Sequence, residues 1–290
     1  MLDFIVNPAA GGEKGKKILR TLSAIQERLM ERKVQYSIHY TAKKGDATLM
    51  TTDLIKRGAT NIIVVGGDGT LHEVINGFTD FDKVAMGIIP CGTGNDFASA
   101  LNIPFDPKDA IDLIIDGQAK FTDFMQMPGV RGLNVIGTGI DVDVLKRYAK
   151  LKRKTKFGYT MSLVKTLFKF NYAEFNAEFN GKTEEYKSFI AAICNGYCYG
   201  GGIKICPTAD PTDNKLNFVA VKSMSKLKII GAFLKLKKGK TDKIKQYVQE
   251  EVSEIKITTP TPCTVNVDGE LYEGIPFEVK IIANTLKIYR

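Results

Sequence analysis

The first 120 residues alternate short apolar runs with segments whose apolar residues recur every three to four positions. The runs LDFIV, VQYSIHY, NIIVV and VAMGII predict strands at 2–6, 34–40, 61–65 and 84–89. Helices are predicted over 18–29, from a cap at Asp46 to Gly58, and over 109–115 with an end near Gly117. This alternation, with almost continuously apolar strands, predicts an N-terminal doubly wound parallel α/β lobe.

From about residue 122 the pattern changes to alternation of apolar and polar residues. The segment YAEFNAEF (172–179) places its apolar side chains on one face, and Asn180–Gly181 after it is the preferred pair for a type I′ hairpin turn. Helices are expected around 141–170 and 225–238. Six further strands are predicted at 186–194, 215–222, 253–259, 264–267, 277–282 and 285–289. The sequence thus predicts an α/β domain at 1–122 and a β-rich, antiparallel, sandwich-like domain at 123–290.

Composition and charge indicate where the protein is located and what kind of partner it binds. The 290 residues are 44% hydrophobic and 25% charged, which is typical of a globular protein. No run of 18 apolar residues occurs, and the N-terminus lacks the features of a signal peptide, so a cytoplasmic protein is expected. The five cysteines form no CxxC pair, which favours free thiols.

The net charge of +9 is concentrated in two stretches, 144–173 and 222–245. Such stretches fit an anionic surface, either nucleic acid or the inner leaflet of a membrane. Within them, FGYTMSLVKTLFKF (157–170) and KLKIIGAFLKLKK (226–238) combine apolar and basic residues in a way that suits a membrane interface.

Three glycine-rich loops follow predicted strands: NPAAGG (7–12), GGDGT (66–70) and PCGTGNDFA (90–98). The carboxyl ends of parallel strands meet at one edge of a sheet, where α/β folds bind ligands. Glycines let backbone N–H groups approach phosphate oxygens, and a following helix adds its positive N-terminal end. Asp68 beside such a cradle would repel phosphate, so it implies Mg²⁺, bound directly or through water. Taken alone, GGDGT also fits a tight turn that an aspartate caps.

The motifs NPAAGG, GGDGTLHEVING and PCGTGNDFA, in this order and spacing, resemble the diacylglycerol kinase catalytic domain, in particular the bacterial soluble lipid kinases and their YegS-like relatives. The resemblance covers nearly the whole chain, since the second half carries VDGE (267–270) and ADPTDNKL (209–216). GGDGT is shared with NAD kinases and 6-phosphofructokinases, whereas PCGTGNDFA belongs to the lipid branch. The chain departs from the family pattern at Ser99 and Ala100, where an arginine is common, and at Asn214, where glycine is common.

The resemblance implies a two-lobe, ATP-dependent lipid kinase with the ATP cleft between the lobes. Asp68 and Asp96 would organise the catalytic Mg²⁺ and its waters. By motif position, the residues implied in nucleotide binding are Asn7, Pro8, Ala9, Ala10, Gly11, Thr41, Gly66, Gly67, Asp68, Gly69, Thr70, Glu73, Thr93 and Asn95.

Two acidic motifs of the second half carry further expectations. Strand alternation through VDGE would put Asp268 and Glu270 on one face, where one could accept the proton of the lipid hydroxyl. The family pattern favours Glu270 as that base, with Asp268 second; a hairpin turn with solvated acids is the alternative. ADPTDNKL resembles the family's structural Mg²⁺ loop, with the Asp213 side chain and the carbonyls of Asp210 and Lys215 as ligands. An ordinary Asp-Asn turn is the alternative there.

The expected reaction is transfer of the γ-phosphate of ATP to a lipid hydroxyl, with diacylglycerol as the acceptor. Monoacylglycerol, phosphatidylglycerol, sphingoid bases and undecaprenol-like alcohols present the same group. The alternatives are an NAD kinase and a non-catalytic nucleic-acid- or membrane-binding protein. The expected partners are ATP and a lipid at the inner membrane surface, where the protein would be peripherally associated. Nucleic acid is not expected as a partner. Antiparallel edge strands can pair with those of a second copy, so a homodimer is compatible with the sequence.

Overall fold

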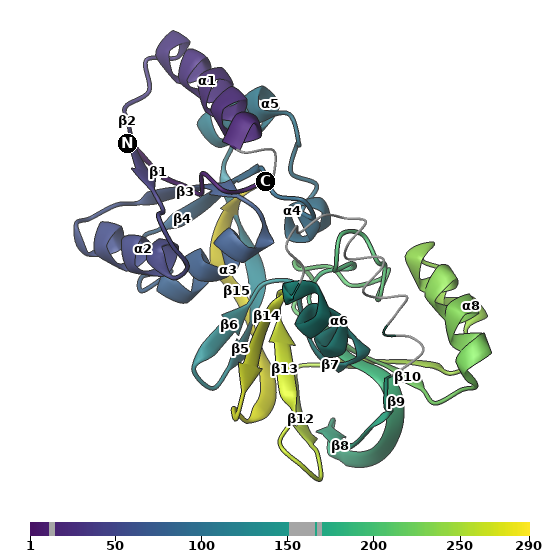
Figure 1. Ribbon diagram of the computed structural model, residues 1–290. Coiled ribbons are helices and arrows are strands. Elements are labelled where there is room, and N and C mark those ends of the chain that lie inside the picture. Colours follow the sequence, from purple (N-terminus) through teal and green to yellow (C-terminus); the bar gives the residue numbers. More distant parts are fainter. Residues whose placement is uncertain (12–14, 151–165, 167–169) are drawn as a thin grey trace. The chain divides into compact units, whose positions relative to one another are not determined.

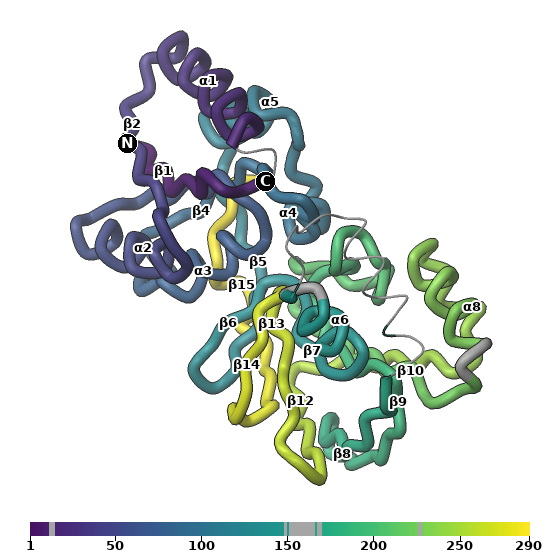
Figure 2. Tube along the Cα trace, viewed as in Figure 1, coloured from purple at the N-terminus to yellow at the C-terminus, as the bar shows by residue number. Residues whose placement is uncertain are grey.

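The computed structural model describes residues 1–11, 15–150, 166 and 170–290 (Figure 1). The chain forms two compact units, which Figure 2 traces by residue number. Unit 1 comprises Met1–Asp123 together with Ala283–Arg290, and unit 2 comprises Phe124–Ile282. The last eight residues therefore return to the unit in which the chain began.

Unit 1 is built on a parallel sheet in the order β4-β3-β1-β2, to which the end of β15 adds in parallel beside β4. This confirms the doubly wound α/β lobe. Its elements are β1 (Leu2–Val6), α1 (Lys16–Glu31), β2 (Tyr36–Tyr40), α2 (Asp46–Lys56), β3 (Asn61–Gly66), α3 (Asp68–Gly77), β4 (Ala85–Pro90), α4 (Asp96–Ala100), α5 (Pro107–Asp116) and the start of β5 (Ala119–Met127).

The helices cover both faces of this sheet, with α1 and α5 on one side and α2 and α3 on the other (Figure 1). The buried face of α1 packs with α5 and the sheet in one core, and the ion pair between Arg28 and Asp112, with 2.6 Å between Nε and Oδ1, joins the two helices. On the other side Gly77 of α3 touches α2 so closely that an added Cβ would collide with the carbonyl oxygen of Thr48.

The expected cap of α2 is wrong. Gly45 occupies the N-cap position, and the Asp46 carboxylate accepts hydrogen bonds from the backbone N–H groups of Ala42 and Lys43, at 2.8 and 2.9 Å. Asp46 therefore closes the loop that precedes the helix instead of satisfying the first turn.

Unit 2 is rich in antiparallel strands. Its elements are the end of β5, β6 (Val130–Gly132), β7 (Val135–Gly139), α6 (Ile140–Ala149), β8 (Ala173–Phe179), β9 (Lys182–Cys194), β10 (Leu216–Lys222), α8 (Lys226–Lys237), the 3₁₀ turn η2 (Thr241–Lys243), β11 (Tyr247–Val252), β12 (Glu254–Thr258), β13 (Thr264–Val267), β14 (Glu270–Glu273) and most of β15 (Phe277–Tyr289). The β8–β9 hairpin turns at Asn180 and Gly181 with φ of 49° and 72°, as the type I′ prediction requires.

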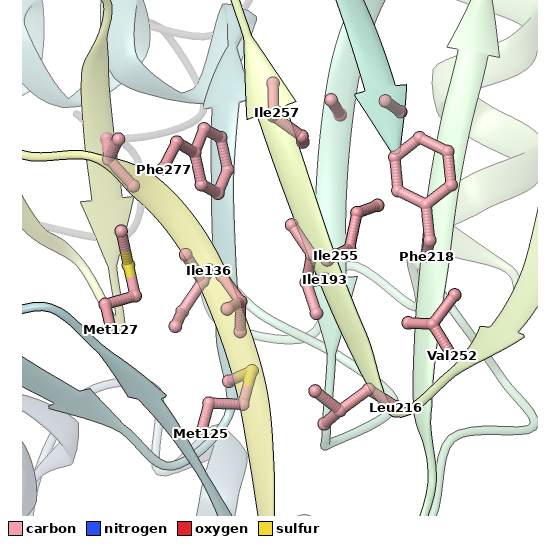
Figure 3. Packing of buried hydrophobic residues seen from close by; sticks show 14 of the residues in the cluster. Met125, Met127, Ile136, Ile193, Leu216, Phe218, Val252, Ile255, Ile257 and Phe277 are labelled. Carbon is pink, nitrogen blue, oxygen red and sulfur yellow. The ribbon is translucent and has the colours of Figure 1, made fainter. Parts of the chain in front are cut away.

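Strands β7, β9 and β10 contribute side chains to two cores. One core lies among the strands and includes Ile136, Ile193 and Phe218 with residues of β5, β12 and β15 (Figure 3). The other lies under the helices and includes Val135, Ile190 and Val219 with Ile140 of α6 and Ile229 of α8. Burial on both faces explains why β9 and β10 contain continuous apolar runs.

The two strands predicted at 277–282 and 285–289 are one strand, β15. Its first residues pair antiparallel with β12, and Lys287 and Ile288 pair in parallel with Ala85 and Met86 of β4. At the junction Asn284 has φ of 49°, and its N–H donates to Asp123 at 2.7 Å. The apolar pattern breaks here because the strand changes partners.

The sequence missed β5, β6, β7, β11 and β14. The helix expected over 141–170 is described only as α6 up to Ala149, and most of 157–170 lies outside the described residues. No described helix is long and apolar enough to cross a bilayer. All five cysteines are free thiols, as expected.

Candidate active site

The first glycine-rich loop is tied to the second through Asn7. This residue follows β1, and its Nδ2 donates to Thr70 Oγ1 in the first turn of α3 at 3.1 Å. Its Oδ1 accepts from the N–H of Ala9 at 3.0 Å and holds the loop in a turn. Asn7 thus fixes where this loop begins relative to the GGDGT motif.

The first loop also touches the third. Gly11 has φ of 77°, and a Cβ at this position would stand 2.6 Å from the carbonyl oxygen of Cys91. Lys17, in the first turn of α1, donates to the Gly92 carbonyl oxygen at 3.3 Å. The sequence interpretation did not single out Lys17, although a base soon after a phosphate-type loop is a usable signal.

The second and third loops meet at two glycines. A Cβ on Gly67 would lie 2.7 Å from Gly92 Cα, and a Cβ on Gly92 would lie 2.5 Å from Gly67 Cα. Asn95 closes the third loop, because its Oδ1 accepts from Gly92 N at 2.8 Å and its Nδ2 donates to Gly92 O at 3.2 Å. The three loops therefore converge at the carboxyl ends of β1, β3 and β4, as predicted.

Two carboxylates face the same spot beside these loops. A Cβ on Gly94 would stand 2.9 Å from Asp68 Oδ2 and 3.4 Å from Asp96 Oδ2. Asp68 begins α3, and its Oδ1 accepts from the N–H of Phe97 at 3.2 Å, while Asp96 is buried at the start of α4. Any side chain at Gly94 would occupy the space that both carboxylates border.

The other residues implied in nucleotide binding differ in exposure. Gly69 borders open space, since a Cβ added to it would meet nothing within 4 Å. Pro8, Ala9 and Thr93 are exposed, and Ala10 is half-buried.

Three of the implied residues serve the fold. The Glu73 carboxylate accepts from the N–H groups of Gly45 and Ala47, at 2.9 and 3.2 Å, and so satisfies the start of α2. Thr41 is buried, and its N–H donates to Val6 O at 2.9 Å. Gly66 leaves room for Thr70, whose Oγ1 would be 2.6 Å from an added Cβ.

In unit 2 the alternation argument for VDGE is wrong. Asp268 and Gly269 form the turn between β13 and β14, with φ of 52° and 98°, and Glu270 begins β14 opposite Val267. A strand periodicity does not continue through a two-residue turn, so Asp268 and Glu270 do not share a strand face. The same Asp-Gly signal that marks type I′ hairpins was present in the sequence.

The Asp268 carboxylate holds the chain that precedes β7. Its Oδ2 accepts from Leu133 N at 2.6 Å, and its Oδ1 accepts from Asn134 N and Val135 N at 2.9 and 3.1 Å. Three backbone donors on one carboxylate make a strong charge-assisted anchor.

A buried carboxyl group lies behind this turn. Asp141, near the start of α6, is buried and accepts from Asn266 Nδ2 at 2.9 Å. Burial raises the pKa of Asp141 to about 6, which the bond from Asn266 only partly opposes. No sequence pattern pointed to Asp141, because its burial depends on residues more than 120 positions away.

The Asp210–Asp213 loop closes on itself. Asp210 Oδ1 accepts from the N–H and the hydroxyl of Thr212, at 3.0 and 2.8 Å, and Asp213 Oδ1 accepts from Lys215 N at 2.9 Å. Asn214 has φ of 63°, which asparagine tolerates. These bonds are those of ordinary Asx turns, so a metal at Asp213 with carbonyls of Asp210 and Lys215 stays a prediction.

Comparison with known proteins decides the family. The model of the diacylglycerol kinase catalytic domain matches residues 2–127, and that of the YegS C-terminal NAD kinase beta sandwich-like domain matches residues 134–290. The chain belongs to the diacylglycerol kinase family. A diacylglycerol kinase of Staphylococcus aureus is 30% identical over 291 residues, which cover 99% of this chain and 89% of the relative.

Two further proteins support this place among the diacylglycerol kinases. One from Bacillus subtilis is 29% identical over 282 residues, covering 95% of this chain and 91% of its own. A solved structure of a Bacillus anthracis protein classed with the diacylglycerol kinases is 27% identical, with a TM-score of 0.82 and coverage of 99% and 96%. The chain is thus an ATP-dependent lipid kinase, as the three loops and the resemblance led us to expect.

The carboxylates of this kinase fit a divalent cation of the kind that phosphoryl transfer uses. Among the described residues, no group of three or more His, Cys, Asp or Glu side chains is placed to hold a metal ion. Mg²⁺ in kinases is held by one or two carboxylates together with waters and substrate phosphates, so a cation site there does not need three protein ligands.

Proposed function

We propose that this lipid kinase transfers the γ-phosphate of ATP to the hydroxyl of diacylglycerol and so forms phosphatidic acid. The observation that carries the proposal is the approach of Gly67 to Gly92, which places two bare backbone segments beside Asp68 and Asp96. Such a surface suits a polyphosphate, because backbone N–H groups can reach oxygens that a Cβ would exclude.

The nucleotide is proposed to bind at the three loops of unit 1. The residues are those from Asn7 to Gly11 and from Gly66 to Thr70, with Thr41, Glu73, Thr93 and Asn95 as implied by the resemblance. Asn7, Asn95 and Glu73 would act by shaping the loops, since their side chains already bond to backbone or hydroxyl groups.

Asp68 and Asp96 are proposed to hold the divalent cation, with Mg²⁺ as the ion. A bound cation of this kind neutralises charge on the transferring phosphoryl group. The Asp68 oxygen that accepts from Phe97 N fixes the carboxylate, so the charge at this point is held in place before the nucleotide arrives.

Glu270 is proposed to accept the proton of the lipid hydroxyl. Asp268 is the weaker candidate, because its carboxylate already accepts three backbone N–H groups and protonation would weaken these bonds. The base and the anchor are then neighbouring residues with separate tasks.

The lipid acceptor is proposed to be reached at an anionic membrane surface, where basic stretches of a protein with net charge +9 would bind. Diacylglycerol is the acceptor we favour because relatives that match this chain from end to end bear that name. The cytoplasmic location, the peripheral association with the inner leaflet and the homodimer belong to the same proposal.

The test uses Asp68→Asn with labelled ATP and a panel of lipids. Asparagine can keep the bond to Phe97 N but loses the charge, so turnover should fall at least about hundredfold while thermal stability stays within 2 °C or so of the wild type. The wild type should phosphorylate diacylglycerol in preference to phosphatidylglycerol, a sphingoid base and NAD. Wild-type-like turnover in Asp68→Asn, or preference for another acceptor, would contradict the proposal.

A further inference from the structure

Helix α8 carries an apolar pair that the core of unit 2 does not use. Ile229, Ala232 and Leu236 are buried against the core under the helices. Ile230 and Leu234 lie four residues apart, hence on one helix face, and are 37% and 53% exposed. A helix that only covered a sheet would present polar residues there.

The surroundings of this pair are basic. Lys237 and Lys238 continue the same face in the next turn. Neither lysine forms an ion pair with any residue that the structure describes, and no acidic residue occurs from 222 to 241. The charge on α8 is therefore available to an external anion.

Gly231 leaves one edge of this face without a side chain. Gly231 lies beside the pair, and a Cβ there would meet nothing within 4 Å. In Figure 1, α8 stands at the margin of unit 2, outside the strands that it covers. A glycine beside two exposed apolar residues lets a surface approach the helix backbone there.

We propose that α8 is the element that inserts into an anionic bilayer, with Ile230 and Leu234 entering the acyl boundary and the lysines meeting lipid phosphates. Apolar side chains flanked by lysines are the signature of helices that lie in a membrane interface, and long lysine stems place their ammonium groups above an apolar layer. This inference rests on the proposed lipid kinase function and adds to it the part of the molecule that reaches the lipid.

The alternative occupant of this face is a second copy of the chain. A copy would have to place α8 against a surface that tolerates its unpaired lysines, whereas an anionic bilayer supplies both an apolar layer and negative charge. The charge complementarity favours the bilayer.

The experiment compares the wild type with Ile230→Ser/Leu234→Ser and with Leu49→Ser as the matched control. Leu49 is 69% exposed on α2, where Asp46 and Asp53 flank it. Co-sedimentation with vesicles of phosphatidylcholine containing about a third phosphatidylglycerol should show binding roughly tenfold weaker for the double variant and unchanged for Leu49→Ser. Turnover of a dispersed short-chain diacylglycerol should stay at the wild-type value in both.

A double charge-reversal variant tests the proposal a second time and does not depend on packing. Lys237→Glu/Lys238→Glu should weaken binding to the anionic vesicles several-fold, whereas Lys56→Glu/Lys120→Glu on unit 1 should not. Vesicle binding by Ile230→Ser/Leu234→Ser that equals the wild type would overturn the inference. So would a change from dimer to monomer in sedimentation equilibrium, which would assign the face to a second copy. A wild type that binds vesicles through α8 but phosphorylates no lipid would refute the proposed function instead.

Discussion

The Asp268 carboxylate accepts N–H groups from Leu133, Asn134 and Val135, and this arrangement separates it from Glu270, two residues on. A carboxylate with three backbone donors stabilises local structure as long as it stays ionised. Glu270 lies at the beginning of β14, beyond the turn that Asp268 anchors. Two acids that look alike in the sequence VDGE therefore differ in what their loss should cost.

Substitution of each acid by its amide should separate these tasks. Asp268→Asn replaces one accepting oxygen by a donor and should lower the free energy of unfolding by about 1–3 kcal/mol. Glu270→Gln should leave unfolding unchanged and reduce turnover roughly hundredfold or more. Urea unfolding and turnover at saturating lipid measure the two effects. A stable but inactive Asp268→Asn beside an active Glu270→Gln would transfer the base to Asp268.

The loops at residue scale were predictable because glycine spacing records where a backbone must be bare. The close approach of Gly67 and Gly92 leaves no room for a Cβ on either residue, and both belong to the glycine-rich motifs of the sequence. Asp141 was not predictable, since nothing in IDVDV distinguishes this aspartate from Asp143 or shows that it will be buried beside Asn266. The anchor at Asp268 was missed because a strand was assumed where the Asp-Gly pair makes a turn.

At the scale of elements, α6 begins with a buried acid, and this should make the stability of the kinase depend on pH. The pKa of Asp141 is raised by burial to about 6, from an ordinary value near 4. The folded state therefore favours the protonated form of this carboxyl group. The stability that the protonated group contributes is fully present below about pH 4 and is lost as the pH rises through about 6.

Asp141→Asn should remove this dependence, because the amide stays neutral and its oxygen can still accept from Asn266. The variant should be more stable than the wild type at pH 7, by up to about 3 kcal/mol, and equal to it near pH 4. Urea unfolding of both proteins between pH 4 and 7.5 measures the difference. A constant difference across this range would mean that Asp141 is ionised throughout or that the substitution acts by packing.

Strands that keep the same neighbouring strands along their length were predicted well, and strands that change neighbours were not. Strand β8 buries Phe175, Ala177 and Phe179 on one face, so its alternation was legible. Strand β15 was divided in two at Ala283 and Asn284, where its partner changes from β12 to β4. Strand β7 was missed because VIGTG contains two glycines, one of which would place a Cβ 2.7 Å from the carbonyl oxygen of Ala191.

At the scale of the whole molecule, the chain leaves unit 1 after Asp123 and returns at Ala283. The returning residues bury Leu286 and Ile288 completely, and Tyr289 donates its hydroxyl to Asn61 Oδ1 at 2.6 Å. One strand of the α/β sheet is thus separated in sequence from the rest of unit 1 by the whole of unit 2.

Deletion of 283–290 should therefore damage unit 1 and spare unit 2. Loss of two fully buried aliphatic side chains should cost unit 1 roughly 4 kcal/mol or more, a large share of the stability of a typical domain. Hydrogen exchange should show faster amide exchange in β3 and β4 and unchanged protection in β9 and β10. Deletion of Arg290 alone is the control, and equal protection of β4 in both truncated proteins would contradict the expectation.

One side chain of β3 bonds at both the first and the last strand of unit 1, since Asn61 donates to the carbonyl oxygen of Met1 at 3.4 Å and accepts from Tyr289. Everything from Phe124 to Ile282 is an insertion between them. A pulling force applied at Met1 or at Arg290 must extract β1 or the end of β15 before tension reaches any strand of unit 2. The sheet that carries the three glycine-rich loops would then yield first, while the inserted unit was still folded.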